Sequence, residues 1–301
     1  MAGALAVTGV LGVVLAGRGA RFVNALNSVP VSIMAIAVLL QVIALVARSE
    51  AWNICVHAAG GTVTRRPVFR AAGVGCLASV LNGSVGMATR IITLRRSAPD
   101  AVPGLPALLA AELPIITVEV ALAAIFSFTM IAPLGIAWWA PVIAVVIMGV
   151  AVLALRRAVD RRRTGLWRGL AVMRSRSRRR MVACVLLAVC AQVARNWLML
   201  RAVGVHISVF DAMALLIATF TIGQLPIGPS MGPAAAVLIL GSHGVALAAA
   251  AGVLLTATGT VAGVSYAGWA IIDRMVDGRR AASRGSPAVA PVVPSPAAAV
   301  S

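Results

Sequence analysis

The chain has 301 residues, of which 61% are hydrophobic and only 11% are charged, and its mean hydropathy is +1.00. A soluble domain carries about 25% charged residues, so this composition excludes a soluble enzyme and indicates a polytopic α-helical membrane protein. All 26 basic residues are arginine, and the net charge is +18. The arginines lie at the ends of apolar runs without interleaved aromatic residues, which favours contact with anionic lipid over binding of nucleic acid.

A membrane helix needs about 20 predominantly apolar residues, and eight segments of the chain approach or exceed this length. They span residues 2–17, 30–57, 68–89, 106–131, 136–155, 181–203, 209–246 and 247–272. Segment 2–17 has no basic region before it, so we expect a first membrane segment rather than a cleaved signal peptide. The predicted fold class is therefore an all-α polytopic membrane protein with about six to eight transmembrane helices.

Residues 156–180 separate two apolar halves. These 25 residues include 11 arginines and one acid, Asp160. An arginine in the middle of a bilayer costs at least about 2.5 kcal/mol, so we expect a solvated loop, which the positive-inside rule places in the cytoplasm. The predicted organisation in the inner membrane is a first membrane half at 1–155, a cytoplasmic loop at 156–180, a second membrane half at 181–278 and a disordered, cytoplasmic tail at 279–301.

Two of the apolar segments contain residues that break a helix. Segment 68–89 has Asn82, Gly83 and Ser84 near its centre, and segment 209–246 is interrupted by the glycines and prolines of residues 223–233. If the basic flanks stay in the cytoplasm, segment 68–89 begins and ends inside and segment 209–246 begins and ends outside. We therefore predict two re-entrant segments, with the first tip near Gly83, that enter the membrane from opposite faces.

The two halves share an order of features, which indicates an internal repeat. Arg48, Trp52, Gly61, Phe69, Gly83 and Gly86 are followed at offsets of 141 to 147 residues by Arg195, Trp197, Gly204, Phe210, Gly228 and Gly232. Chance alignment in so skewed a composition is the alternative. The near-constant offset favours an ancient duplication, and inverted repeats with broken helices are the plan of many secondary transporters.

The broken helices and the charges at depth supply the candidate substrate-binding residues. Half-helix ends expose backbone N–H groups and a dipole that bind anions, whereas helix packing through small residues is the alternative. The candidates at the two breaks are Asn82, Gly83, Ser84, Gly228, Pro229 and Ser230. Arg48 and Arg195 lie well inside their spans, so we expect them to face an aqueous cavity or a partner; snorkelling to an interface is the alternative. Arg90 closes the first re-entrant segment and is a further candidate for contact with a lipid phosphate.

Glu112 and Glu119 are seven residues apart on one helix, about 10.5 Å along a single face. Pro114 between them is expected to kink the helix. We interpret the two acids as ion-pair partners of Arg48 or Arg195 or as proton-coupling groups, with a purely structural ion pair as the alternative. No nucleophile accompanies them, and the cysteines and histidines lack the spacing of a zinc site, so we expect no catalytic residue, metal or cofactor.

Two motifs carry a resemblance to a known family. They are Asn82-Gly83-Ser84-Val85-Gly86-Met87-Ala88-Thr89-Arg90, followed by Arg95-Arg96, and Pro226-Ile227-Gly228-Pro229-Ser230-Met231-Gly232-Pro233. Segments 30–96 and 181–272 resemble the membrane region of lysylphosphatidylglycerol synthases and their stand-alone, flippase-like relatives. Two glutamates of the family pattern are missing, because Met87 occupies the first position and residues 233–236 offer no acid at the second.

The resemblance implies translocation of lipid between leaflets. No aminoacyltransferase domain accompanies the membrane segments, so we expect a protein that is not an enzyme and that moves an anionic phospholipid or lipid-linked substrate. Membrane lipids are then its partners, and Arg48, Arg90 and Arg195 contact the headgroup phosphate. The alternative is a non-transporting scaffold or partner subunit of a cell-envelope enzyme. A transferase acting on polyprenyl lipids is less favoured because no acidic metal-binding motif lies in a polar loop.

Overall fold

The computed structural model describes residues 19–79, 83–161, 165–205, 207–222, 231–240 and 244–284, and in these residues the chain forms helices and no β-strand. The α-helices and the 3₁₀ helices (η) in chain order are α2 (Gly19–Asn27), α3 (Val31–Ala58), α4 (Arg65–Ser79), α5 (Gly83–Ser97), α6 (Leu105–Ala110), α7 (Leu113–Phe126), η1 (Ser127–Met130), α8 (Ile131–Leu134), α9 (Trp139–Arg161), η2 (Gly165–Met173), α10 (Arg178–Ala202), α11 (Val209–Ile222), α12 (Met231–Leu240) and α13 (Val245–Arg284).

Four stretches of the described chain are long and apolar enough to cross a membrane. They are Val31–Ala58, Leu105–Met130, Arg178–Ala202 and Val245–Asp277. Shorter apolar helices occupy Trp139–Leu155 and Val209–Thr221. These spans confirm the predicted all-α polytopic membrane fold, although the described residues contain four full-length spans where about six to eight were predicted.

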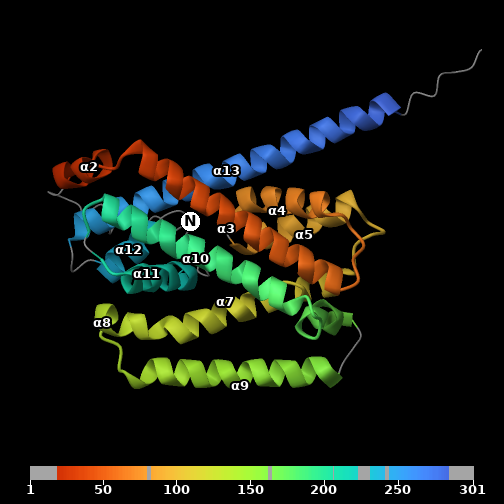
Figure 1. Ribbon diagram of the computed structural model, residues 1–301, viewed down its shortest axis with the longest axis horizontal. Coiled ribbons are helices and arrows are strands. Elements are labelled where there is room, and N and C mark those ends of the chain that lie inside the picture. The colour runs from red at the N-terminus through yellow and green to blue at the C-terminus, as the bar shows by residue number, and fades with distance from the viewer. Residues whose placement is uncertain are drawn as a thin grey trace, which may run out of the picture.

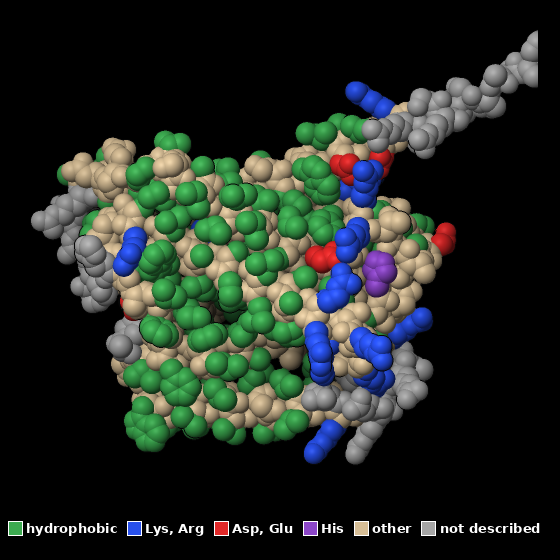
Figure 2. Space-filling model, in the orientation of Figure 1, with side chains coloured by type: hydrophobic (Ala, Val, Ile, Leu, Met, Phe, Trp, Pro, Cys, Tyr) green, Lys and Arg blue, Asp and Glu red, His purple; other side chains and the backbone are tan. Residues whose placement is uncertain are grey.

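The surface of the molecule agrees with a membrane environment. Large apolar side chains of α9 are exposed at Val142, Ile143, Val146, Ile147, Val150 and Leu153. Figure 2 shows apolar side chains over most of one face, while arginine and acidic side chains gather towards one end. An apolar belt with charges collected at an end is the distribution expected of a helical bundle surrounded by lipid.

Helices α3 and α10 pack along each other through the middle of the molecule (Figure 1). Small buried residues, Ala44 and Ala47 of α3 and Ala188 and Ala191 of α10, form the contact. Small side chains allow the two backbones to approach closely, which is how helices associate in lipid. Since α13 also packs against both helices, the predicted first and second halves of the chain share one core.

The two central helices end in the same glycine cap. After α3, Gly60 has φ of 94°, and after α10, Gly204 has φ of 87°, a left-handed conformation that glycine adopts without strain. In each cap the next residue donates its N–H to the carbonyl five residues back, at 3.0 Å for α3 and 3.1 Å for α10. This pattern is a Schellman cap. Because roughly a third to a half of helices end in such a left-handed cap, the predicted duplication stays a prediction.

If the two caps are taken as equivalent positions, the alignment of the two halves shifts. They pair Gly204 with Gly60 rather than with Gly61, an offset of 144 residues. At that offset Arg48 corresponds to Gln192, and Arg195 lies three residues, about one helical turn, further on. In that register Arg48 and Arg195 differ by one turn, and their equivalence stays a prediction.

The two segments predicted to be re-entrant form pairs of short helices. Helices α4 and α5 pack against each other, and so do α11 and α12. The 15 residues of α4 and of α5 give each a length of about 22 Å, less than the ~30 Å hydrocarbon core. The two pairs lie at opposite ends of the molecule in Figure 1. Their entry from opposite faces stays a prediction, and the breaks at 80–82 and 223–230 lie outside the described residues.

The arginine-rich stretch is only partly a solvated loop. Helix α9 continues to Arg161, and η2 turns back to pack against α6. Leu170 and Val172 of η2 are buried, and a Cβ at Gly169 would clash with the carbonyl oxygen of Ala107. The expectation of a solvated loop is therefore wrong for residues 165–173, because their apolar side chains pack into the protein.

Three further boundaries differ from the sequence prediction or lie outside the structure. Helix α13 continues to Arg284, so the tail predicted to begin at residue 279 starts as helix. The kink expected at Pro114 is a break just before it, because α6 ends at Ala110 and proline is accommodated in the first turn of α7. The first predicted segment, 2–17, and residues 285–301 lie outside the described residues.

Candidate functional site

A cavity of about 390 Å³ lies between α3, α4, α10, α11 and α13. We call it the polar chamber because of its uncharged polar and cationic lining. Its polar side chains are Gln41, Arg48, Ser79, Gln192, Arg195, Asn196, Thr219, Thr256 and Thr260. Three of the contributing helices contain candidate membrane spans, so these polar groups lie within the apolar bundle. Polar residues at such depth are costly and mark binding sites and transport pathways.

A second cavity of about 190 Å³ adjoins the first between α7, α10 and α11. We call it the apolar chamber, because its lining is mostly Leu122, Ala123, Phe126, Val189, Val193, Met213, Leu216, Ile217 and Phe220. The two chambers share four lining residues: Arg48, Gln192, Leu216 and Thr219. Figure 2 shows the surface hollowed between the layer of α10 and α11 and the layer of α7 and α9. We call the two adjoining chambers together the crevice.

Arg48 and Glu119 form an ion pair at the boundary between the chambers. The Nη2 atom of Arg48 donates to Oε2 of Glu119 at 2.9 Å and ties α3 to α7. The Glu119 side chain is 11% exposed and that of Arg48 is 40% exposed. Arg48 was one of the two ion-pair partners expected for Glu119. Because the two charges cancel, this pair contributes no net charge to the crevice.

Arg195 has no carboxylate partner in the described part of the chain. Its guanidinium donates to the side-chain oxygen of Gln41 and, at 3.5 Å, to the carbonyl of Leu255. Its Nε is buried without a hydrogen-bond partner. Among the residues that line either chamber only Glu119 is acidic, and it is paired with Arg48. The polar chamber therefore presents one unbalanced positive charge, whose desolvation is costly.

Arg90 and Glu112 form a second ion pair, outside both chambers. Arg90 donates to a carboxylate oxygen of Glu112, and its guanidinium carbon lies 4.3 Å from the centre of the Trp52 ring. The two side chains are 14% and 5% exposed. The expectation that Glu112 pairs with Arg48 or Arg195 is therefore wrong, because the contact between α5 and α6 brings Arg90 to it. The predicted contact of Arg90 with lipid phosphate would compete with an existing internal partner.

The first hairpin is the pair of helices α4 and α5. Its motif residues at the start of α5 line neither chamber. Gly83 and Ser84 are exposed at the start of α5 and line neither chamber. A Cβ at Gly83 would meet nothing within 4 Å, so no close approach requires glycine there. Asn82, Gly228, Pro229 and Ser230 lie outside the described residues.

Several lining residues were not singled out from the sequence. Gln41 and Gln192 are polar residues in long apolar segments, and Gln41 lies seven residues, two helical turns, before Arg48. This spacing places Gln41 on the same face of the helix as Arg48, so the sequence could have indicated it as a lining residue. Cys76 and Ser79 bring the first hairpin to the polar chamber, but the sequence motif pointed to the break itself and to α5.

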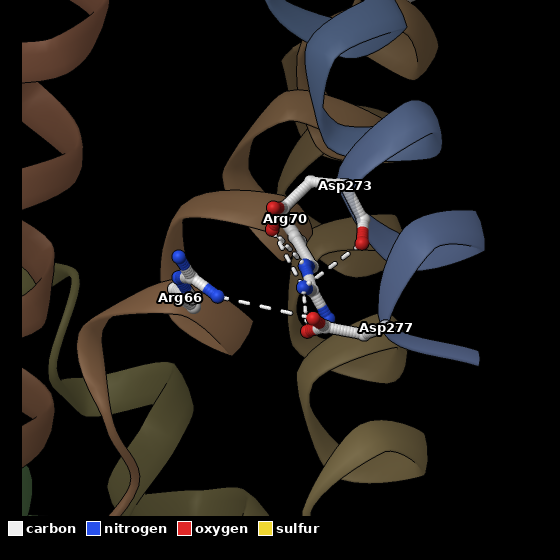
Figure 3. Close-up of polar contacts among 4 residues, drawn as sticks. All are labelled: Arg66, Arg70, Asp273 and Asp277. Atoms are coloured by element: carbon white, nitrogen blue, oxygen red, sulfur yellow. Dashed lines mark hydrogen bonds and ion pairs between the residues drawn. The ribbon is translucent and has the colours of Figure 1, made fainter. Parts of the chain in front are cut away.

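A cluster of charges holds the first hairpin on α13 (Figure 3). Nε of Arg70 donates to Asp273 at 2.6 Å, the same guanidinium contacts Asp277, and Arg66 lies 3.8 Å from Asp277. Burial disfavours the charged form of Arg70, but its hydrogen bonds to the two carboxylates raise its pKa above the usual value. Such charge-assisted bonds are stronger than neutral ones, so the cluster is a firm anchor for α4. More than 200 residues separate its two sides in sequence.

The fold and the crevice define an all-α polytopic membrane protein with a cationic polar chamber between its helices. The described residues contain no group of three or more His, Cys, Asp or Glu side chains placed to hold a metal ion. Residues 1–276 match the family described as the lysylphosphatidylglycerol synthase TM region, and the chain belongs to this family. Membership groups it with membrane proteins of lipid metabolism or transport. No curated protein and no solved structure was found to match the chain.

Proposed function

We propose that this protein moves an anionic phospholipid or lipid-linked substrate between the two leaflets of a bacterial inner membrane. The observation that carries the proposal is Arg195, a partly buried, unbalanced cation in a polar chamber that lies between apolar helices. An arginine that only stabilised the bundle would be expected to have a carboxylate partner, as Arg48, Arg70 and Arg90 do. Membership in a family of lipid metabolism or transport supports a lipid as the ligand.

The crevice supplies what a headgroup needs to pass through hydrocarbon. A headgroup that leaves water loses its hydrogen bonds, and the amide and hydroxyl side chains of the polar chamber replace them. Ser79 brings the first hairpin to this chamber and Thr219 brings α11 of the second. In the proposed mechanism the two hairpins open the chamber in turn to the two faces, the alternating access of transporters built from broken helices. The charged end that carries α4 and η2 faces the cytoplasm.

The proposal makes the protein a transporter rather than an enzyme. The crevice offers the unpaired cation Arg195 and hydroxyl, thiol and amide groups, and the one carboxylate among its described lining residues, Glu119, is paired with Arg48 rather than placed to activate a nucleophile. A membrane scaffold for a cell-envelope enzyme is the rival function. A scaffold function would leave the unbalanced charge of Arg195 without a role.

Reconstitution tests the proposal. Purified protein is inserted into sealed phosphatidylcholine vesicles that contain a trace of phosphatidylglycerol with a fluorescent acyl chain, and a membrane-impermeant reductant bleaches the outer leaflet. We expect bleaching to continue into the inner-leaflet pool with wild-type protein and to stop at the outer pool with Arg195→Gln. Arg201→Gln is the matched control, because Arg201 lies on the same helix, is exposed and stacks on Trp197 outside the crevice. Folded wild-type protein that leaves the inner pool protected would overturn the proposal.

A further inference from the structure

We infer that Glu119 is a proton-binding site and that one proton enters the crevice together with each anionic headgroup of the cargo. This inference rests on the proposed function, which brings an anion into the crevice. It adds the source of energy, because a difference in pH across the membrane would then drive the movement of the cargo.

Glu119 differs from the other described acids because it lines the crevice. The ionisable side chains in the walls of the two chambers are Arg48, Cys76, Glu119 and Arg195. Arginine keeps its proton in proteins, and a thiol is neutral with its proton bound. Glu119 is therefore the group in these walls that a proton converts from a charged form to a neutral one.

One oxygen of Glu119 is open to a proton. Oε2 accepts a hydrogen bond from Arg48 at 2.9 Å, whereas Oε1 accepts none from the described residues. Oε1 is also not among the buried polar atoms that lack a partner, so its surface is accessible where Glu119 lines the apolar chamber. The proton comes from solvent, binds Oε1 and leaves Glu119 as a neutral carboxylic acid, and no other bond of the protein is made or broken covalently.

Arg48 is placed to exchange Glu119 for another anion. Its side chain is 40% exposed, against 17% for Arg70 and 14% for Arg90. Arg48 also lines both chambers, whereas Arg70 and Arg90 line neither. The ion pair of Arg48 with Glu119 is thus the one that an anion in the crevice can open.

Opening of this pair by a cargo anion would create the need for a proton. When the anion draws Arg48 away, Glu119 is left without its cation, although its side chain is only 11% exposed. An unpaired carboxylate in such surroundings is costly, and a bound proton removes that cost. Binding of the anion and binding of the proton therefore favour each other, as linkage requires.

The net charge of the crevice stays the same when both ligands are bound. Without ligands, the charges of Arg48 and Glu119 cancel and Arg195 leaves one positive charge. An anion alone would bring the sum to zero, and the proton restores it to one. Cargo and proton thus cross the membrane as a neutral pair, so the difference in pH acts on their movement and the membrane potential does not.

The other charges near Glu119 form pairs of their own. Besides Arg48 of α3, Arg90 of α5 and Glu112 of its own helix interact with it electrostatically. Arg90 and Glu112 are bonded to each other, so their effects on Glu119 oppose. The remaining described ionisable side chains on the elements that pack against α7, apart from Arg195 of α10, line neither chamber. Release of Arg48 is therefore the change that alters the charge beside Glu119.

Calorimetry on the purified full chain in detergent counts the protons. Dioctanoyl phosphatidylglycerol is titrated in two buffers of the same pH that differ in their enthalpy of ionisation. The phosphodiester of this probe stays ionised near neutral pH, so protons that are taken up go to the protein. We expect proton uptake on binding by the wild-type protein, and an affinity that falls by up to about tenfold for each unit of rise in pH.

Glu119→Gln should abolish both the proton uptake and the dependence of the affinity on pH. Glu50→Gln is the matched control, because Glu50 also pairs with an arginine, Arg65, at 2.7 Å but lines neither chamber. It should keep the uptake and the pH dependence of the wild-type protein. If Glu119→Gln fails to fold, as judged by gel filtration and melting, the wild-type measurement still decides, because binding without proton uptake overturns the inference.

Sealed vesicles test the coupling itself. With the interior more alkaline than the exterior, labelled phosphatidylglycerol should accumulate in the inner leaflet, and a protonophore should abolish this accumulation. In Glu119→Gln the pH difference should have no effect on the distribution of the lipid. Lipid that moves in the wild-type protein but ignores the pH difference would contradict the inference.

The outcomes separate this inference from the proposed function. Lipid movement without proton uptake, or uptake that survives Glu119→Gln, overturns the proton site and leaves the proposed function standing. Binding that takes up a proton through Glu119 without any lipid movement overturns the proposed function and leaves the proton site standing. Folded protein that neither binds nor moves phosphatidylglycerol overturns both.

Discussion

Arg195 of α10 donates a hydrogen bond to the side chain of Gln41 on α3, across 154 residues of sequence. This contact joins the two central helices at the wall of the polar chamber, and both residues line it. A neutral amide orients the guanidinium without cancelling its charge. The arginine is thereby held in place and kept available to an anion, which distinguishes it from the arginines that are paired with carboxylates.

The role of Gln41 can be separated from that of Arg195 by a double-mutant cycle. Gln41→Leu removes an acceptor from a buried cation and should lower stability by about 1–3 kcal/mol. Gln41→Leu combined with Arg195→Met removes both polar partners and should recover most of that loss, yet abolish lipid movement. Unfolding in mixed micelles, followed by tryptophan fluorescence, gives the free energies. A double variant that still moves lipid would refute the role of Arg195.

Removing Arg48 and removing Glu119 from their ion pair should lower the free energy of unfolding by different amounts. Arg48→Gln leaves the 11% exposed Glu119 without its cation, whereas Glu119→Gln leaves the 40% exposed Arg48 with access to solvent. We expect a cost of about 1–3 kcal/mol for Arg48→Gln, below that of a fully buried broken pair, and a smaller cost for Glu119→Gln. Combining the two substitutions should restore part of the loss. Melting of the three variants measures this order, and equal costs would contradict it.

The first hairpin can be locked onto α13 through a native cysteine. A Cβ at Gly263 would lie 3.2 Å from Sγ of Cys76, close to the separation found across a disulfide. Gly263→Cys, with the other three native cysteines replaced by alanine, should therefore form a bond to Cys76 on oxidation. If the hairpin moves during transport, oxidation stops lipid movement and reduction restores it.

Once the disulfide has formed, neither thiol reacts with a maleimide reagent, and this loss of reactivity reports its formation. The same chain with Cys76→Ala is the control, because it keeps the added cysteine and cannot form the bond. Unchanged lipid movement in the fully oxidised protein would show that α4 stays on α13 throughout.

The opposite entry of the two hairpins is tested by labelling from the two sides of the membrane. With the native cysteines replaced, Gly83→Cys and Ser230→Cys are made one at a time and exposed to an impermeant maleimide. We expect residue 83 to react from the cytoplasmic side and residue 230 from outside, because basic residues flank the first hairpin and stay in the cytoplasm. Reaction of both from one side would exclude the inverted arrangement.

Much of the candidate site could be predicted from local sequence, and the predictions that failed have identifiable causes. Arg48, Arg195 and Glu119 stood out because charges inside apolar spans are costly, and all three line the crevice. The glycine motif drew attention to Gly83 and Ser84, which line neither chamber. Glu112 was matched to the wrong arginine, because spacing along one helix says nothing about which helix packs beside it.

The sequence alone determined the helical membrane class, the family and the depth of the charges, because hydropathy and helical periodicity are local properties. The tertiary structure decided which charges cancel. Arg48 meets Glu119, Arg90 meets Glu112 and Arg70 meets two aspartates only because particular helices pack side by side. The same packing left Arg195 with a neutral partner, since Gln41 is the side chain that α3 brings to it. Net charge at a site is a sum over neighbours in space, and for this crevice those neighbours come from distant parts of the chain.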